Sequence, residues 1–346
     1  MNQFRRDPIT GQWSIILDNE MDLGELISNQ QSRKSESSVP QPARCQLCSG
    51  SEAETLPEIF AVRPAKSERN ADGWSVRVVP SKQPYLQIYG HLNNRGVGMY
   101  DVLDGIGAHE LVIESPEHGV QLHDLDLNQL ENVLLAYRER ILDLKQDDRF
   151  RYVLLHKNYG VGQPDVLNHS HSHIIATPIT PTRVKLELMS AMEHYRYKER
   201  CIFCDLIYQE LADDDRVIVQ NEEYLAVTPF ASRSPFEVWI LPKQHETFFE
   251  ARSDHNQLAA ILKEILQKIY STLNNPNFVM VLHTGPNIST GKLRGYWKTV
   301  ERDFHWHIEI TPRFRGVASF DIGSGFNINI VSPETATRIL RKGRLD

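Results

Sequence analysis

The chain has 346 residues, of which 40% are hydrophobic and 24% are charged, and its formal net charge is −7. These values describe a globular protein with enough apolar side chains for a sizeable core. The acidic balance argues against general electrostatic binding of nucleic acid, and the apolar runs are too short to span a bilayer. The first residues, MNQFRRDPITGQW, lack the apolar centre of a signal peptide, so we expect a cytoplasmic protein.

The four cysteines form two Cys-x-x-Cys pairs, Cys45/Cys48 and Cys201/Cys204. In a chain without an export signal, such pairs indicate metal or redox sites rather than disulfides. The first pair follows a polar stretch at about 20–44 that is rich in Ser, Gln and Pro. We expect this stretch to be a mobile arm.

Hydrophobic periodicity predicts strands and long helices in each half of the chain. Apolar residues at helical spacing predict helices at about 125–146 and 258–269, and a charged stretch predicts another at 181–200. The expected strands lie at 13–17, 74–80, 109–114, 151–156, 216–220, 237–241, 278–283 and 305–310. Strands with one long helix per half predict an α+β fold with antiparallel sheets.

Three histidines alternate with serines in the segment NHSHSHIIATP at 168–178. If this segment is a strand, His169, His171 and His173 share one face, while Ser170 and Ser172 lie on the other. Imidazoles gathered on one face can bind a metal, attack phosphorus and donate hydrogen bonds to a phosphate. This segment is therefore the first candidate for a functional site.

The two halves of the chain repeat one another in five features that occur in the same order. Each half has a Cys-x-x-Cys pair, a strand in which a Glu precedes a His by eight residues, a helix with Asn-Gln-Leu, a strand ending in His, and a His-x-His strand before Thr-Pro. The matched residues include Cys45/Cys201, Glu110/Glu237, His118/His245, Asn128/Asn256, His156/His283 and His169/His305. This order predicts a duplicated fold, with halves at 1–185 and 186–346.

Each half also contains two cysteines and two histidines, a ligand set that commonly holds tetrahedral zinc. The first set is Cys45, Cys48, His118 and His169, and the second is Cys201, Cys204, His245 and His305. A redox role for one cysteine pair is the alternative. Matching histidines beside both pairs favour two structural zinc sites.

His171 lies two residues beyond a predicted zinc ligand on the same strand face. A neutral imidazole, with a reference pKa of about 6.5, is a competent nucleophile towards phosphorus near neutral pH. Ligation of His169 would fix the strand and therefore the angle of attack. His173 would reach the phosphate oxygens, as would backbone N–H groups of the loop that includes Asn158 and Gly160. For His307, the matched residue of the second half, a packing or metal role is favoured.

The sequence resembles the galactose-1-phosphate uridylyltransferase family of the histidine-triad superfamily along nearly its whole length. The matching residues are RRDPITGQW at 5–13, the strand at 74–80, Asn158-x-Gly160 thirteen residues before His171, and the segments 320–329 and 332–334. ADP-glucose and dinucleoside polyphosphate phosphorylases are related members. The resemblance implies a duplicated histidine-triad-like fold and makes a homodimer a reasonable expectation.

By this resemblance, His171 would carry the nucleotidyl group as a covalent intermediate, and the first Cys2His2 set would hold zinc. Some members bind a second metal at positions that match Glu187, His283, His305 and His307. Others bind it at positions that match Cys201, Cys204, His245 and a histidine of the last strand. Because both cysteines are present here, we favour the second arrangement, with His305 as the fourth ligand.

Two differences from the family pattern bear on the substrate. His173 stands where the transferases usually carry Gln and the small histidine-triad hydrolases carry His. In the predicted turn at 80–85, Ser81 replaces the usual Asn and Gln83 the usual aromatic residue. Ser81 is therefore a candidate substrate-binding residue.

The predicted function is nucleotidyl transfer. His171 would attack the α-phosphorus of a nucleoside diphosphate sugar, release a sugar 1-phosphate, and pass the nucleotidyl group to a phosphate or sugar phosphate. Exchange between a UDP-hexose and a hexose 1-phosphate is the leading case. The alternatives are phosphorolysis of ADP-glucose or a dinucleoside polyphosphate, nucleotide hydrolysis, and nucleotide binding without turnover. No nucleic-acid or membrane partner is expected.

Overall fold

The computed structural model describes residues 1–17, 24, 45–160, 169–289, 295, 297–314 and 319–343. Apart from Gly24, the arm expected at about 20–44 lies outside the described residues. Within the described ranges, no helix is both long and apolar enough to cross a membrane.

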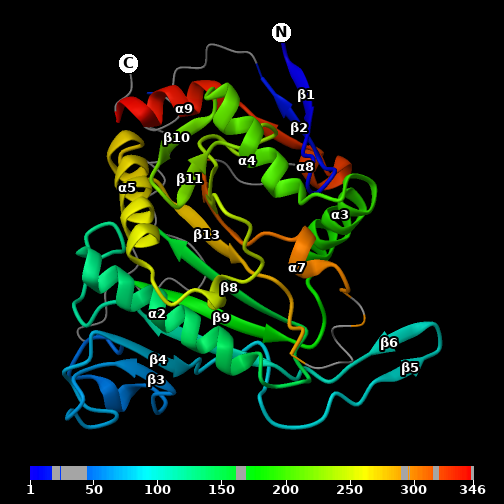
Figure 1. Ribbon diagram of the computed structural model, residues 1–346. Helices are drawn as coiled ribbons and strands as arrows, with labels where there is room; N and C mark the ends of the chain where they lie inside the picture. Colours follow the sequence, from blue (N-terminus) through cyan, green and yellow to red (C-terminus); the bar gives the residue numbers. More distant parts are fainter. Residues whose placement is uncertain are drawn as a thin grey trace.

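A ten-stranded sheet runs through the molecule, and each half of the chain contributes five of its strands (Figure 1). In spatial order the strands are β10 (Val217–Gln220), β11 (Tyr224–Val227), β12 (Val238–Pro242), β14 (His307–Pro312), β13 (Phe278–His283), β8 (Tyr152–Tyr159), β9 (His171–Thr177), β7 (Ala108–Ile113), β4 (Val76–Pro80) and β3 (Phe60–Val62). All neighbours pair antiparallel, and β8 and β13 meet at the centre. Outward from the centre, β8-β9-β7-β4-β3 matches β13-β14-β12-β11-β10. The predicted duplicated α+β fold is thereby confirmed.

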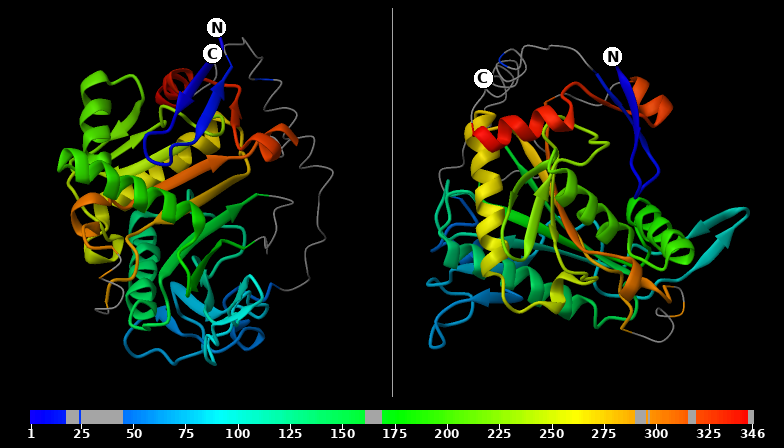
Figure 2. Two further views of the ribbon diagram at one scale, coloured as in Figure 1. Left: turned by 90° about the vertical axis from the view of Figure 1, so that its right-hand side faces the viewer. Right: turned by 45° about the horizontal axis from the view of Figure 1, so that its top comes forward.

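Helices cover both faces of this sheet (Figures 1 and 2). The long helix of each half, α2 (Leu127–Leu144) or α5 (Asn256–Thr272), packs on one face, and the two helices contact each other. On the other face, α3 (Thr182–Lys198), α4 (Ile202–Asp213) and α7 (Val300–Asp303) cover the second half. The remaining helices of the described ranges are η1 (Glu52–Glu54), η2 (Phe249–Ala251), α8 (Ser319–Ser324) and α9 (Pro333–Lys342).

Two smaller sheets complete the structure. The N-terminal strands β1 (Gln3–Arg6) and β2 (Trp13–Ile16) form a hairpin, and β2 pairs in parallel with β15 (Asn327–Asn329) near the C-terminus. The second is the hairpin of β5 (Arg95–Val97) and β6 (Tyr100–Val102), which projects from the body (Figure 1). The predicted boundary between 185 and 186 falls inside α3, and the division into two folding units stays a prediction.

The two long helices predicted from periodicity appear as α2 and α5, and the helix predicted from a charged stretch appears as α3, but α4 was not predicted. Its Cys201 lies at the N-cap and Cys204 in the first turn, so the second Cys-x-x-Cys pair opens a helix. The buried residues of α4 include Ile202, Phe203 and Ile207. This short apolar run does not carry a long helical pattern, which explains why periodicity alone did not reveal the helix.

A buried ion pair contacts β9 on its serine face, opposite the histidines. The ammonium group of Lys157 on β8 lies 2.6 Å from a carboxylate oxygen of Glu114, which follows β7, and both side chains are almost fully buried. Lys157 also donates to the carbonyl of His171 at 3.0 Å. Ser170 and Ser172 donate to Glu114, so the serine face of the strand is anchored. The phenol of Tyr137 on α2 donates to the same carboxylate at 2.7 Å.

Both charged groups of this ion pair have further hydrogen-bond partners, which stabilise the pair. Burial alone would raise the pKa of Glu114, but Lys157 and the two serine hydroxyls hold it below its usual value. A buried charge that loses its partner is strongly destabilising. The network therefore fixes how β7, β8, β9 and α2 meet.

Lys157→Met is expected to lower the free energy of unfolding by about 3–5 kcal/mol, because it leaves the Glu114 carboxylate buried without a counter-charge. The double variant Lys157→Met/Glu114→Gln should regain part of this loss, because it removes the unpaired charge. Urea unfolding of zinc-loaded protein measures both values. A double variant less stable than the single one would contradict the assignment.

Candidate active site and metal centres

A cavity of about 580 Å³ opens on the face of the first half that lies opposite α2. Its floor is formed by β7 and β9, which contribute His109, His171 and His173. The turn after β4 contributes Ser81 and Tyr85 to its wall, and the Cys-x-x-Cys segment closes another side. The cavity thus brings together histidines from neighbouring strands.

The proton of His171 is placed by a main-chain carbonyl. Its Nδ1 lies 2.7 Å from the carbonyl oxygen of His169, and the side chain is buried. A carbonyl only accepts hydrogen bonds, so the neutral ring carries its proton on Nδ1 and its lone pair on Nε2. His171 therefore has the tautomer that an Nε2 nucleophile requires.

His173 lies beside His171 on the same face and contacts two further histidines. Its Nδ1 is 2.9 Å from Nε2 of His109, and its ring stacks on that of His156 with centroids 5.0 Å apart. Burial, followed by the three neighbouring histidines, lowers the pKa of His173 to about 2, so the ring is neutral. Among the described residues, its Nε2 has no hydrogen-bond partner.

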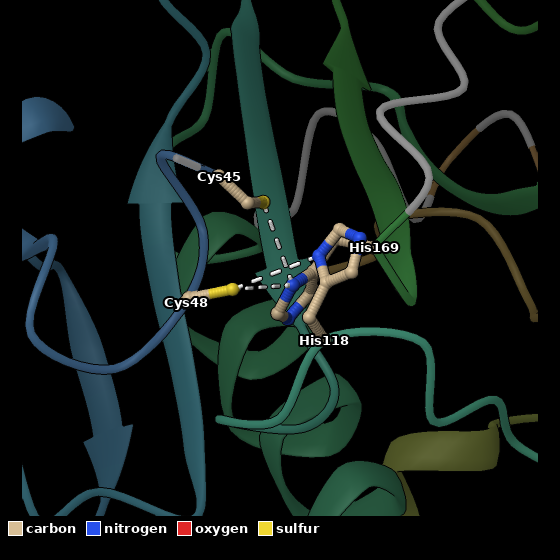
Figure 3. A group of neighbouring side chains, drawn as sticks. All are labelled: Cys45, Cys48, His118 and His169. Atoms are coloured by element: carbon tan, nitrogen blue, oxygen red, sulfur yellow. Dashed lines mark hydrogen bonds between the residues drawn. The ribbon is translucent and has the colours of Figure 1, made fainter. Parts of the chain in front are cut away.

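The first Cys2His2 set comes together beside this cavity (Figure 3). The Nδ1 atom of His169 is 3.6 Å from each sulfur of Cys45 and Cys48, and Nδ1 of His118 is 3.6 Å from Cys48. A tetrahedral zinc with Zn–S of about 2.3 Å and Zn–N of about 2.1 Å requires S···N distances of about 3.6 Å. The other nitrogen of His169 donates to the carbonyl of Ser115 at 2.7 Å, which orients the ring. These residues fit a zinc ion.

The second Cys2His2 set repeats this geometry. Cys201, Cys204, His245 and His305 offer ligand atoms within 4.8 Å of one another. The sulfur of Cys204 lies 3.5 Å from Nδ1 of His245 and 3.7 Å from Nδ1 of His305. His305 donates from Nε2 to the carbonyl of Pro242 at 2.9 Å, as His169 does in the first half. This donor set also fits zinc.

The alternative ligand set named by family resemblance is split. His305 lies with the two cysteines, whereas Glu187, His283 and His307 gather with Glu309 in a separate, fully buried group. His283 Nδ1 is 2.9 Å from Glu187, and its ring stacks on His307 with centroids 4.7 Å apart.

Two arginines already neutralise the carboxylates of this buried group. Arg183 and Arg233 approach Glu309 at 2.8 and 2.7 Å, and Arg183 also lies 3.3 Å from Glu187. Burial alone would lower the pKa of His283, but Glu187 and Glu309 raise it to about 9, so the ring is charged near neutral pH. The carboxylates of this group are therefore paired with arginines and with His283, while Nε2 of His283 and Nε2 of His307 have no hydrogen-bond partner among the described residues.

His307, the counterpart of His171, lies within a packed core. It is 1% exposed, and the rings of Phe203 and Trp239 lie 5.2 and 5.4 Å from it. Burial, followed by His283, lowers its pKa to about 4. A substrate has no access to such a ring.

One of the three predicted substrate-binding residues lines the cavity. Ser81 lines the cavity, whereas Asn158 and Gly160 are not among its lining residues. Gly160 has φ of +107°, and an added Cβ would fall 1.9 Å from the amide oxygen of Asn277, so this position requires glycine for packing. The remaining residues of the predicted phosphate loop at 158–162, which are 161 and 162, lie outside the described residues.

Sequence reasoning missed several residues of the cavity wall. Tyr85 lines the cavity with its ring 4.7 Å from that of His109, beside Gln83, which was named from the sequence. Lys82 is the one lysine or arginine among the described lining residues, and it donates to Gln46 at 3.1 Å. The sequence could have indicated His109, because it lies in an alternating strand on the face opposite Glu110. The structure pairs Glu110 with Arg140 in a buried ion pair.

His283→Gln is expected to lower the free energy of unfolding near neutral pH by on the order of 2–3 kcal/mol. The folded-state pKa of His283 is raised, so its contribution is complete below the ordinary value of 6.5 and is lost as pH rises through about 9. The difference between wild type and variant should therefore shrink from pH 6.5 to pH 10. A pH-independent difference, or three metal ions per wild-type chain, would contradict the ion-pair assignment.

Comparison with known proteins agrees with this architecture. A family model described as "Galactose-1-phosphate uridyl transferase, C-terminal domain" matches residues 187–328. The chain is 31% identical over 344 residues to ADP-glucose phosphorylase of Arabidopsis thaliana, which covers 98% of this chain and 92% of that protein. It is 29% identical over 250 residues to galactose-1-phosphate uridylyltransferase of Thermotoga maritima, covering 69% and 75% of the two chains.

A solved structure extends the likeness to three dimensions. The structure of the Arabidopsis thaliana ADP-glucose phosphorylase with bound ADP-glucose matches with a TM-score of 0.78 and 29% identity, covering 99% of this chain and 98% of that chain. Sequence and fold therefore agree along almost the full length. The chain belongs to the galactose-1-phosphate uridylyltransferase family and is a nucleotidyltransferase.

Proposed function

We propose that the protein transfers the nucleotidyl group of a nucleoside diphosphate sugar through a covalent intermediate on His171. The supporting observation is the arrangement on the cavity floor. The lone pair of His171 is on Nε2, and the neutral His173 ring lies beside it with centroids 5.0 Å apart. Nucleophile and phosphate-binding group thus share one strand face.

The reaction has two balanced displacements. Nε2 of His171 forms an N–P bond with the α-phosphorus as the P–O bond to the β-phosphate breaks, which releases the sugar 1-phosphate. An oxygen of the second phosphate then attacks the same phosphorus, the N–P bond breaks, and His171 regains its lone pair. The proton on Nδ1 stays shared with the carbonyl of His169 and stabilises the charge that develops on the ring.

For the substrate pair we favour ADP-glucose and orthophosphate. The supporting finding is the likeness to an ADP-glucose phosphorylase over 98% of the chain, together with a similar structure that holds ADP-glucose. The second candidate, UDP-hexose with a hexose 1-phosphate, is supported by the family model and by the Thermotoga maritima relative. Both use the same step on His171, so one experiment separates them.

Intact-protein mass after brief mixing with ADP-glucose, without an acceptor, is expected to show an adenylyl adduct on the wild-type chain. His171→Ala should form none, because no nucleophile remains. UDP-glucose in a parallel reaction tests the uridylyl alternative, and loss of the adduct to phosphate, sugar phosphate or water identifies the acceptor.

The matched control for this experiment is His307→Gln, which alters the equivalent position of the second half and should keep the adduct. Circular dichroism checks that both variants are folded. An adduct that persists in His171→Ala would contradict the assigned nucleophile.

We propose that each Cys2His2 set holds one zinc ion. The support is the match between the S···N distances and tetrahedral zinc geometry. A zinc ion on the first set would anchor His169, two residues before the nucleophile. A zinc ion on the second set would tie the start of α4 to β14.

Elemental analysis is expected to give two zinc ions per wild-type chain and about one in Cys48→Ser and in Cys204→Ser. Both variants should unfold at lower temperature, because zinc binding and folding are coupled. Cys48→Ser should slow adduct formation on His171 far more than Cys204→Ser, which serves as its matched control. Equal slowing in both variants would contradict a positioning role for the first site.

The expected homodimer and cytoplasmic location stay predictions. Exposed apolar side chains on the projecting β5–β6 hairpin support the homodimer. These are Val97, Met99 and Tyr100, with exposed fractions of 54%, 88% and 69%.

A further inference from the structure

Three hydrogen-bonding groups form a line from the cavity wall to His173. The backbone nitrogen of Tyr85 lies 3.3 Å from Nδ1 of His109. Nε2 of His109 lies 2.9 Å from Nδ1 of His173, and both histidines are buried. The line therefore connects a main-chain donor to the ring beside the nucleophile.

The first group sets the direction of every hydrogen bond in this line. A backbone N–H can only donate, so Nδ1 of His109 must accept. A neutral His109 then carries its proton on Nε2 and donates it to Nδ1 of His173. Because Nδ1 of His173 accepts, the proton of that neutral ring is on Nε2.

The other arrangements place two donors face to face. If His173 donated from Nδ1, the proton of a neutral His109 would move to Nδ1 and would point at the N–H of Tyr85. A protonated His109 would have the same conflict, because both of its nitrogens carry protons. The geometry therefore allows one assignment of protons.

We propose that His109 is a positioning residue that fixes His173 in the Nε2–H tautomer and so makes it a hydrogen-bond donor to the phosphate on His171. This inference rests on the proposed nucleotidyl transfer. A donor beside the reacting phosphorus stabilises the charge on its oxygens, whereas a bare lone pair would repel them. Nε2 of His173 is buried and has no partner among the described residues, and His173 lines the cavity, so a phosphate bound there would satisfy this donor.

Substitutions at His109 separate the direction of the hydrogen bonds from simple packing. In His109→Gln, the amide oxygen can accept from Tyr85 while the amide nitrogen donates to His173, so the direction is kept. His109→Glu offers only acceptors when ionised, and His109→Leu offers neither. His156→Phe is the matched control, because it keeps a flat ring stacked on His173 and is not part of the line.

The first measurement is the tautomer of His173 by nitrogen-15 NMR of zinc-loaded protein labelled at histidine. His173→Gln identifies the signals, because they are absent in that variant. We expect the Nε2–H form in wild type, His109→Gln and His156→Phe. In His109→Glu the proton should move to Nδ1, because an ionised carboxylate only accepts. In His109→Leu neither nitrogen of His173 is constrained, so both tautomers should be populated.

The second measurement is the single-turnover rate of adduct formation with ADP-glucose. The rate should stay within about threefold of wild type in His109→Gln and fall about 10- to 100-fold in His109→Glu and His109→Leu, as expected for loss of a hydrogen bond to a charged group. In a His173→Gln background the added His109→Leu change should cost less than about threefold, because a glutamine amide donates without a tautomer.

The outcomes separate this inference from the proposed function. A His173 ring that keeps the Nε2–H tautomer in His109→Glu would overturn it, as would an equal loss of rate with and without His173→Gln. A wild-type protein that forms no adduct with any donor overturns the proposed function instead, whereas the NMR result still decides whether His109 sets the tautomer.

Discussion

The buried ion pair between Glu114 and Lys157 is the constraint on which the active site depends. Side chains alternate along β9, so a slip of one residue would turn its histidines towards α2 and its serines into the cavity. Such a slip would remove the hydroxyl groups of Ser170 and Ser172 from the Glu114 carboxylate. The network therefore selects the register that places His171 and His173 on the floor of the cavity.

Hydrogen bonds to main-chain carbonyls then determine which nitrogen of His169 and of His171 keeps its lone pair. The carbonyl of Ser115 accepts from Nε2 of His169, which leaves Nδ1 towards the cysteines. The carbonyl of His169 accepts from Nδ1 of His171, which leaves the lone pair on Nε2. Two neighbouring histidines on one strand face thus acquire opposite tautomers and different chemistry, with no charged residue needed to set them apart.

Duplication supplied this arrangement twice, and the surrounding side chains separated the two copies. His305 and His307 repeat the carbonyl contacts of the first half, with Nε2 of His305 on Pro242 and Nδ1 of His307 on His305. In the first half, an open cavity lies over this face of the sheet. In the second half, α3 and α4 cover the sheet, and Phe203 packs against His307. The same backbone geometry therefore borders an open cavity in one half and a packed core in the other.

The sequence by itself determined the duplicated fold, the long helices α2, α3 and α5, and the two Cys2His2 sets. Helix α3 was predicted from a charged stretch after Pro181, and the other features depend on spacing along the chain, either as helical and strand periodicity or as residues repeated in order. Apart from Gly24, residues 20–44 lie outside the described residues, as do residues 161 and 162 of the predicted phosphate loop. The mobile arm and the phosphate-binding role of the loop therefore stay predictions.

Only the tertiary structure decided which distant residues meet. It paired Glu114 with Lys157, brought His109 within 2.9 Å of His173, and gave Gly160 a packing role against Asn277. It also separated His305 from the buried group around His283. Contacts of this kind depend on the register between strands that are far apart in the sequence, and no local pattern records that register.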